Sequence, residues 1–118
     1  MKLTIYGETP SKKNSRITLK NGRTIPSKQY RDWHESAMLQ LSAQCQLDKP
    51  IEKCIISMTF YHGDLRRRDS DNGATSVLDL LTDCGIIKDD NWQVVSQLNI
   101  KNEYDKGQPR VLIIIVGC

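Results

Sequence analysis

Apolar and polar residues alternate in several short stretches of this chain and recur at helical spacing in two longer ones. The alternation over residues 2–6 and 54–61 predicts two strands, each with one apolar face. Residues 94–101 and 110–116 predict two closing strands, joined by a polar turn over residues 102–108.

A small hairpin and a helix are predicted between the first two of these strands. Asn21-Gly22 is the strongest short hairpin signal, and it separates residues 16–19 from residues 23–25. Ser27 is a suitable N-cap for the helix that follows. The apolar stripe of this helix comprises Tyr30, Trp33, Ala37, Leu41 and Cys45.

A second helix is predicted from about Asn72 to Cys84, and Gly85 is a natural stop after it. Its expected buried stripe comprises Val77, Leu80, Leu81 and Cys84. The whole order, with two helices among short strands, predicts an α+β fold with a mixed or antiparallel sheet. We expect one such domain over residues 1–118.

Composition and residue spacing argue against several classes of protein. The longest apolar run, residues 111–116, is far shorter than the roughly 20 residues of a transmembrane helix. The first residues do not resemble a signal peptide, so we expect a cytoplasmic protein. The four cysteines form no C-x-x-C pair, and neither His34 nor His62 lies in a ligand pattern, which argues against a zinc or histidine-rich metal site.

Positive charge is concentrated near the N-terminus. Residues 10–31 contain seven basic residues and no carboxylate. The basic residues are Lys12, Lys13, Arg16, Lys20, Arg23, Lys28 and Arg31. Such a segment suits a nucleic-acid backbone, and the alternative is a solvated basic surface.

Three consecutive arginines, residues 66–68, directly precede Asp69-Ser70-Asp71. In an extended segment the two aspartates share one side, where they suit a hard divalent cation, while the arginines suit phosphates. Asp89-Asp90 follows the second helix, by which point the chain has crossed the domain and can return toward the first pair. The residues therefore indicate a metal-dependent nuclease centre. The alternative is that Asp71 caps the helix and the other aspartates are surface acids.

Four segments together resemble the RusA family of small, dimeric, Mg²⁺-dependent Holliday-junction resolvases, which are often of phage or prophage origin. The segments are Pro10–Arg16, Arg66–Asn72, Leu78–Leu81 and Gly85–Val95. Their order and spacing match the family pattern over most of the chain. The resemblance implies a RusA-like homodimer that hydrolyses phosphodiester bonds in four-way DNA junctions during recombination and repair.

The resemblance also implies roles for particular residues. Asp69, Asp71 and Asp90 match the catalytic, metal-binding aspartates, and Asp89 accompanies them without being the usual ligand. Mg²⁺ is the implied cofactor, and branched DNA is the implied partner. The residues expected to contact DNA are Lys12, Lys13, Arg16, Arg67 and Arg68.

One departure from the family pattern concerns Thr75, which stands where the family commonly has a lysine. Either Lys88 or Lys12 supplies the missing cation, or activity is reduced. The main alternative function is therefore a catalytically weakened or inactive branched-DNA-binding protein of the same fold. A second alternative is a nuclease that acts on other branched or single-stranded DNA.

Overall fold

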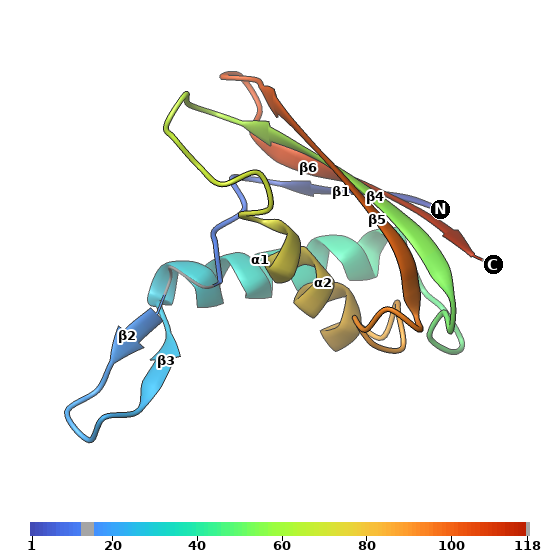
Figure 1. The fold of residues 1–118 in the computed structure, drawn as a ribbon, viewed down its shortest axis with the longest axis horizontal. Coiled ribbons are helices and arrows are strands. Elements are labelled where there is room, and N and C mark those ends of the chain that lie inside the picture. Colours follow the sequence, from blue (N-terminus) through green and yellow to red (C-terminus); the bar gives the residue numbers. More distant parts are fainter. Residues whose placement is uncertain (13–15, 118) are drawn as a thin grey trace.

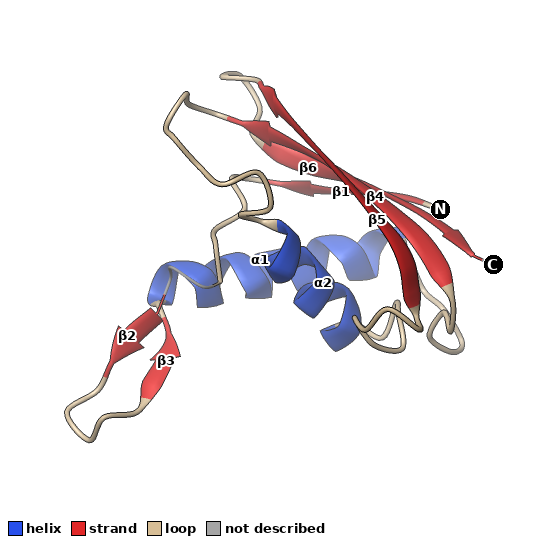
Figure 2. Cartoon of the chain, in the orientation of Figure 1, coloured by secondary structure: helices blue, strands red, loops and turns tan. Residues whose placement is uncertain are grey.

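The computed structural model describes residues 1–12 and 16–117, which form a four-stranded sheet with two helices on one face (Figures 1 and 2). The strands are β1 (Lys2–Tyr6), β2 (Arg16–Thr18), β3 (Thr24–Pro26), β4 (Cys54–His62), β5 (Val95–Tyr104) and β6 (Arg110–Gly117). The helices are α1 (Lys28–Gln44) and α2 (Ala74–Asp83). The predicted α+β class is confirmed.

The sheet has the strand order β1-β6-β4-β5. β6 pairs antiparallel with both β1 and β4, whereas β4 and β5 pair in parallel, so the sheet is mixed. The alternation along β4 and β6 places one apolar face of each strand in the core beneath the helices, as the pattern of apolar residues predicted. The buried residues of these two central strands are Cys54, Ile56, Met58, Phe60, Val111, Ile113 and Ile115.

Helix α1 begins as predicted, because the Tyr30 backbone N–H donates to the Ser27 side chain at 3.2 Å. Four residues of its expected stripe, Tyr30, Trp33, Ala37 and Leu41, are buried, and Cys45 is the C-cap. Two glutamines that flank this buried stripe also have a structural role. The side chains of Gln40 and Gln44 accept hydrogen bonds from the β1 backbone, at 2.7 Å from Tyr6 N–H and 2.9 Å from Thr4 N–H. The two glutamines thus occupy part of an otherwise open sheet edge.

Helix α2 begins two residues later than Asn72, because residues 69–73 form turns instead. The Asn72 N–H donates to the Asp69 carbonyl at 3.0 Å, and the Ala74 N–H donates to the Asp71 carbonyl at 3.1 Å. Gly85 follows the helix with a positive φ of 71°, as expected for its stop. The Asp-Ser-Asp motif therefore lies in a tight turn rather than in an extended segment.

Gly73 brings this turn close to the core. A Cβ atom there would lie 2.7 Å from Phe60 Cε1 and 3.1 Å from Thr9 Cγ2, which is closer than packed atoms allow. The absence of a side chain at position 73 therefore sets how closely α2 and the preceding turn approach β4.

Strands β2 and β3 form the predicted hairpin, which extends away from the sheet and helices (Figure 1). Ile17 and Leu19 are exposed on it. No helix in the described part of the chain is both long and apolar enough to cross a membrane.

Gly73→Ala should reduce the free energy of unfolding by roughly 1–3 kcal/mol, because the new methyl group must displace Phe60 or the turn. Urea unfolding followed by circular dichroism measures the change. Gly117→Ala is the matched control, since nothing lies within 4 Å of a Cβ at that position. Equal stability of the two variants would contradict this prediction, because it would show that the structure accommodates the new methyl group at position 73 at no cost in the free energy of unfolding.

Candidate functional site

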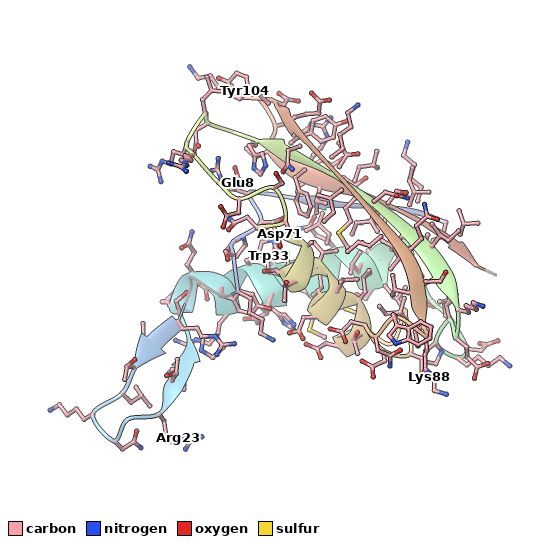
Figure 3. All side chains as sticks on the ribbon, viewed as in Figure 1. Glu8, Arg23, Trp33, Asp71, Lys88 and Tyr104 are labelled. Atoms are coloured by element: carbon pink, nitrogen blue, oxygen red, sulfur yellow. The ribbon has the colours of Figure 1, made fainter. Side chains whose placement is uncertain are left out.

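The arginine run and the Asp-Ser-Asp motif lie in the loop of residues 63–73, which joins β4 to α2. Figure 3 shows Asp71 at the start of α2. Asp69 and Asp71 are exposed, and their carboxylates make no hydrogen bond or ion pair within the described residues. Two hard oxygen donors are therefore available two residues apart.

The three arginines of this loop differ in their surroundings. Arg66 and Arg67 are exposed, and within the described residues the Arg66 guanidinium makes only a long contact, 3.8 Å from Nε to Asp64 Oδ2. Arg68 is 17% exposed, and its Nη2 lies 3.2 Å from Glu8 Oε1 and 3.0 Å from Asp64 Oδ1. Hydrogen bonds from the Arg66 backbone N–H and the Arg68 guanidinium lower the pKa of Asp64. Arg68 thus anchors the loop, while Arg66 and Arg67 are open to solvent.

A hollow of about 390 Å³ adjoins the loop. Arg66, Arg68, Asp69 and Ser70 line it on the loop side, and the end of β5 lines it with Asn102 and Tyr104 among others. Cationic and anionic groups therefore border one concave surface. The cationic groups suit a phosphodiester, and the anionic groups suit a divalent cation.

Asp89 and Asp90 follow α2 and lie beyond its other end, where Figure 3 labels Lys88. Desolvation and the neighbouring Asp89 carboxylate raise the pKa of Asp90, and the charge of Asp79 raises it further. Hydrogen bonds from Asp90 lower the pKa of Asp89. Asp90 is therefore a carboxylate whose negative charge is disfavoured in the free protein and would be favoured by a bound cation.

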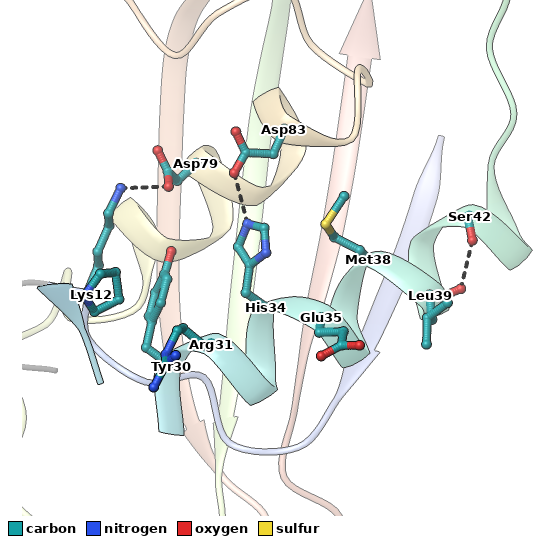
Figure 4. Close-up of a pocket in the computed structure, with 11 residues that line it drawn as sticks. Lys12, Tyr30, Arg31, His34, Glu35, Met38, Leu39, Ser42, Asp79 and Asp83 are labelled. Atoms are coloured by element: carbon teal, nitrogen blue, oxygen red, sulfur yellow. Dashed lines mark hydrogen bonds and ion pairs between the residues drawn. The ribbon is translucent and has the colours of Figure 1, made fainter. Parts of the chain in front are cut away.

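A second hollow, of about 700 Å³, lies between α1 and α2 (Figure 4). At its rim the Lys12 ammonium contacts Asp79 Oδ2 at 2.6 Å. The Lys12 backbone N–H donates to the buried Ser76 hydroxyl at 3.0 Å, and that hydroxyl donates to the Pro10 carbonyl at 2.7 Å. The N-terminal segment is therefore fixed on α2. It places the Lys12 ammonium at Asp79, one helical turn after Thr75.

A second polar pair lines this hollow beside Lys12 and Asp79. His34 Nε2 lies 2.8 Å from Asp83 Oδ2. Burial and the nearby charge of Asp79 raise the pKa of Tyr30 to about 12, so its hydroxyl stays protonated at neutral pH. We therefore assign this hollow a supporting role in holding Lys12 and Asp79.

The structure distinguishes between the two lysines proposed to replace the family's helical lysine. Lys88 is mostly exposed, and its Nζ lies 3.8 Å from Glu52 Oε1. Lys12 contacts α2 directly through Asp79, whose charge also acts on Asp90. Lys12 is therefore the better candidate.

Among the residues that the structure describes, no group of three or more His, Cys, Asp or Glu side chains is arranged to hold a metal ion. Asp69 and Asp71 lie before α2 and Asp90 lies after it. Their oxygen donors nevertheless suit Mg²⁺, which proteins commonly hold with one or two carboxylates plus substrate phosphates. Asp69 and Asp71 therefore fit a divalent cation whose coordination is completed by the substrate, whereas α2, ten residues and about 15 Å long, separates them from Asp90.

The remaining predicted DNA contacts have mixed surroundings. Arg16 is exposed at the start of β2, Lys12 is paired with Asp79, and Lys13 lies outside the described residues. Three residues that sequence reasoning did not identify, Glu8, His62 and Asn102, also contact the loop or one another. Their separation in the sequence gave no pattern that would have identified them.

Comparison with known proteins identifies a family for the chain. The family model described as endodeoxyribonuclease RusA matches residues 7–116. A crossover junction endodeoxyribonuclease RusA from Aquifex aeolicus (strain VF5) is 27% identical over 104 residues, covering 88% of this chain and 81% of that protein. The matched region contains both pairs of aspartates, the arginine run and Lys12.

Proposed function

The chain belongs to the RusA family of endodeoxyribonucleases, enzymes that hydrolyse phosphodiester bonds in DNA, and we propose that this member resolves four-way junctions in a Mg²⁺-dependent reaction. The supporting observation is the loop of residues 63–73, which presents two unpaired carboxylates and two solvent-open arginines, and of these Asp69 and Arg66 line one hollow. The similar protein from Aquifex aeolicus is named for action on crossover junctions.

In the proposed mechanism, Asp69 and Asp71 would hold the divalent cation together with oxygens of the scissile phosphate. The family pattern adds Asp90, which lies beyond the other end of α2 and would have to approach this pair when DNA binds. When bound there, a divalent cation would supply Lewis-acid polarisation of the phosphate and would lower the pKa of a water. Arg66 and Arg67 bind flanking phosphates and fix the strand relative to the aspartates. Lys12, held at Asp79, adds positive charge on the α2 side, where the family commonly has a lysine.

We further propose that the active form is a homodimer in the cytoplasm. A four-way junction has approximate two-fold symmetry and needs two matched cuts. An isologous dimer with one site in each subunit meets this requirement. The exposed β2–β3 hairpin and its basic residues would then contact the junction arms.

Replacing Asp69, Asp71 or Asp90 individually by Asn should reduce junction cleavage by more than about 100-fold, because each change removes a hard anionic ligand. Junction affinity without Mg²⁺ should change little. A labelled synthetic four-way junction, incubated with and without Mg²⁺, measures both properties. Asp89→Asn is the matched control and should retain most activity. Normal cleavage by Asp71→Asn, or equal losses at positions 89 and 90, would contradict the assignment.

Replacing Arg66 and Arg67 together by Ala should flatten the dependence of junction affinity on salt. Each lost phosphate contact lowers the log–log slope by about 0.9 for duplex DNA, so the double variant should lose about 1.8. Binding titrations at several salt concentrations measure the slope. Lys49→Ala, at an exposed lysine in the loop after α1, should leave it unchanged. An unaltered slope in the double variant would place these arginines away from the DNA.

Lys12→Met should lower the single-turnover cleavage rate by roughly 100-fold, the loss typical of removing one preorganised donor from developing charge. Lys88→Met should have no such effect, because Lys88 faces Glu52. Adding Thr75→Lys to Lys12→Met should restore part of the rate. Equal losses for the two single lysine variants, or no rescue by Thr75→Lys, would contradict the assignment of Lys12. A wild-type protein that binds junctions without cutting them would favour the inactive DNA-binding alternative.

A further inference from the structure

Three residues from separate parts of the chain form a continuous chain of hydrogen bonds beside the Asp-Ser-Asp turn. Asn102, on β5, donates from Nδ2 to the Ser70 carbonyl at 2.9 Å. Its Oδ1 lies 2.8 Å from Nε2 of His62, the last residue of β4. Nδ1 of His62 lies 2.9 Å from Oε2 of Glu8. These contacts form the Glu8–His62–Asn102 network.

The orientation of each group in this network follows from hydrogen-bond chemistry. The Ser70 carbonyl can only accept, so the Asn102 amide must present its nitrogen to Ser70 and its oxygen to His62. His62 therefore donates from Nε2, and its Nδ1 must donate as well, because the Glu8 carboxylate that faces it is an acceptor, so both ring nitrogens carry a proton in this arrangement. The His62 ring is held further by lying nearly parallel to the Phe60 ring, with 11° between their planes. The network thus has one consistent arrangement of donors and acceptors.

The network reaches the loop on both sides of Asp69. On one side, Glu8 Oε1 accepts from Arg68 Nη2 at 3.2 Å and from the Gly63 backbone N–H at 3.1 Å. On the other side, Asn102 holds the carbonyl of Ser70, which lies between Asp69 and Asp71. No other described contact ties the Ser70 backbone to the sheet.

We propose that Asn102 is a positioning residue for Asp69 and Asp71, and that His62 and Glu8 hold it in its working orientation. Asn102 fixes the turn backbone through Ser70, so that the two carboxylates project from a defined position before DNA or metal arrives. The catalytic part of this inference rests on the proposed function. The structural part is that Asn102 orders the turn in the free protein, and it does not depend on the proposed function.

Asn102→Asp tests the structural part, because it removes the donor to Ser70 and keeps an acceptor for His62. The matched control is Asn99→Asp, which makes the same chemical change on β5 but alters a contact with Ser57 of β4. In the metal-free protein, amide hydrogen exchange at Asn72 and Ala74 should become faster in Asn102→Asp, on the order of fivefold. Exchange there should be unchanged in Asn99→Asp. Equal exchange in both variants would overturn the proposal, whether or not the wild-type protein cleaves junctions.

The catalytic part is tested by single-turnover cleavage of a synthetic junction at saturating protein over a range of Mg²⁺ concentrations. Asn102→Asp should cleave roughly 10–100-fold more slowly or need correspondingly more Mg²⁺, as is typical when a residue supporting metal ligands is lost. Its junction affinity without Mg²⁺ should match that of Asn99→Asp. A cleavage rate equal to that of Asn99→Asp at every Mg²⁺ concentration would overturn a role in positioning the carboxylates. If the wild-type protein does not cleave, the proposed function fails and the exchange result alone decides the order of the turn.

His62→Phe tests the support of Asn102, since it keeps a flat ring next to Phe60 and removes both ring nitrogens. It should have a smaller effect than Asn102→Asp, in the same direction in both measurements. The double variant should be little worse than Asn102→Asp alone, because the two residues act in series. Additive effects of the two changes would overturn the network as the route by which His62 acts.

Discussion

The parallel pairing of β4 with β5 is the constraint on which the candidate site depends. Because the two strands run in the same direction, their C-terminal ends meet at one edge of the sheet, and Phe60 pairs with Asn102 in the register. The loop that carries the arginines and aspartates leaves β4 at this edge. Asn102 therefore lies where it can reach back to Ser70. An antiparallel β5 in the same place would reverse the strand and remove this arrangement.

The chain after α2 also contains carboxylates whose negative charges repel one another. Desolvation, Asp89 and Asp79 raise the pKa of Asp90 in the folded chain above its value in the unfolded chain. For Asp90 this sign means that folding is disfavoured as pH rises through its pKa values in the unfolded and folded chain, and that the penalty is relieved as pH falls again. The lowered pKa of Asp89, its hydrogen-bonded neighbour, acts in the opposite sense. A bound divalent cation would offset the same penalty at neutral pH. Local destabilisation of this kind is expected where a fold is shaped to hold a charged ligand.

Sequence reasoning was most successful where the determinants are local. The hairpin at Asn21-Gly22, the Ser27 cap and the Gly85 stop depend on neighbouring residues, and all three are confirmed. The start of α2 was less accurate, since the contact of Gly73 with Phe60 and Thr9 is tertiary. The choice between Lys12 and Lys88 was open for the same reason. It depends on Ser76, a helix residue that fixes the Lys12 backbone from 64 positions away.

The Glu8–His62–Asn102 network shows why part of a functional site is absent from sequence patterns. Its residues are 54 and 40 positions apart, and each belongs to a type that is common on protein surfaces. Asp69 and Asp71 are recognisable because they stand two residues apart directly after the arginine run, which is a local pattern. Groups that hold a loop in position need only meet in space, so many pairs of strands can supply them. The contact at Ser70 also leaves no pattern in the sequence, because Ser70 takes part through its main-chain carbonyl and not through its side chain. The residues that define the chemistry of such a site can therefore be predicted from the chain, whereas those that define its geometry follow from the order and direction of the strands.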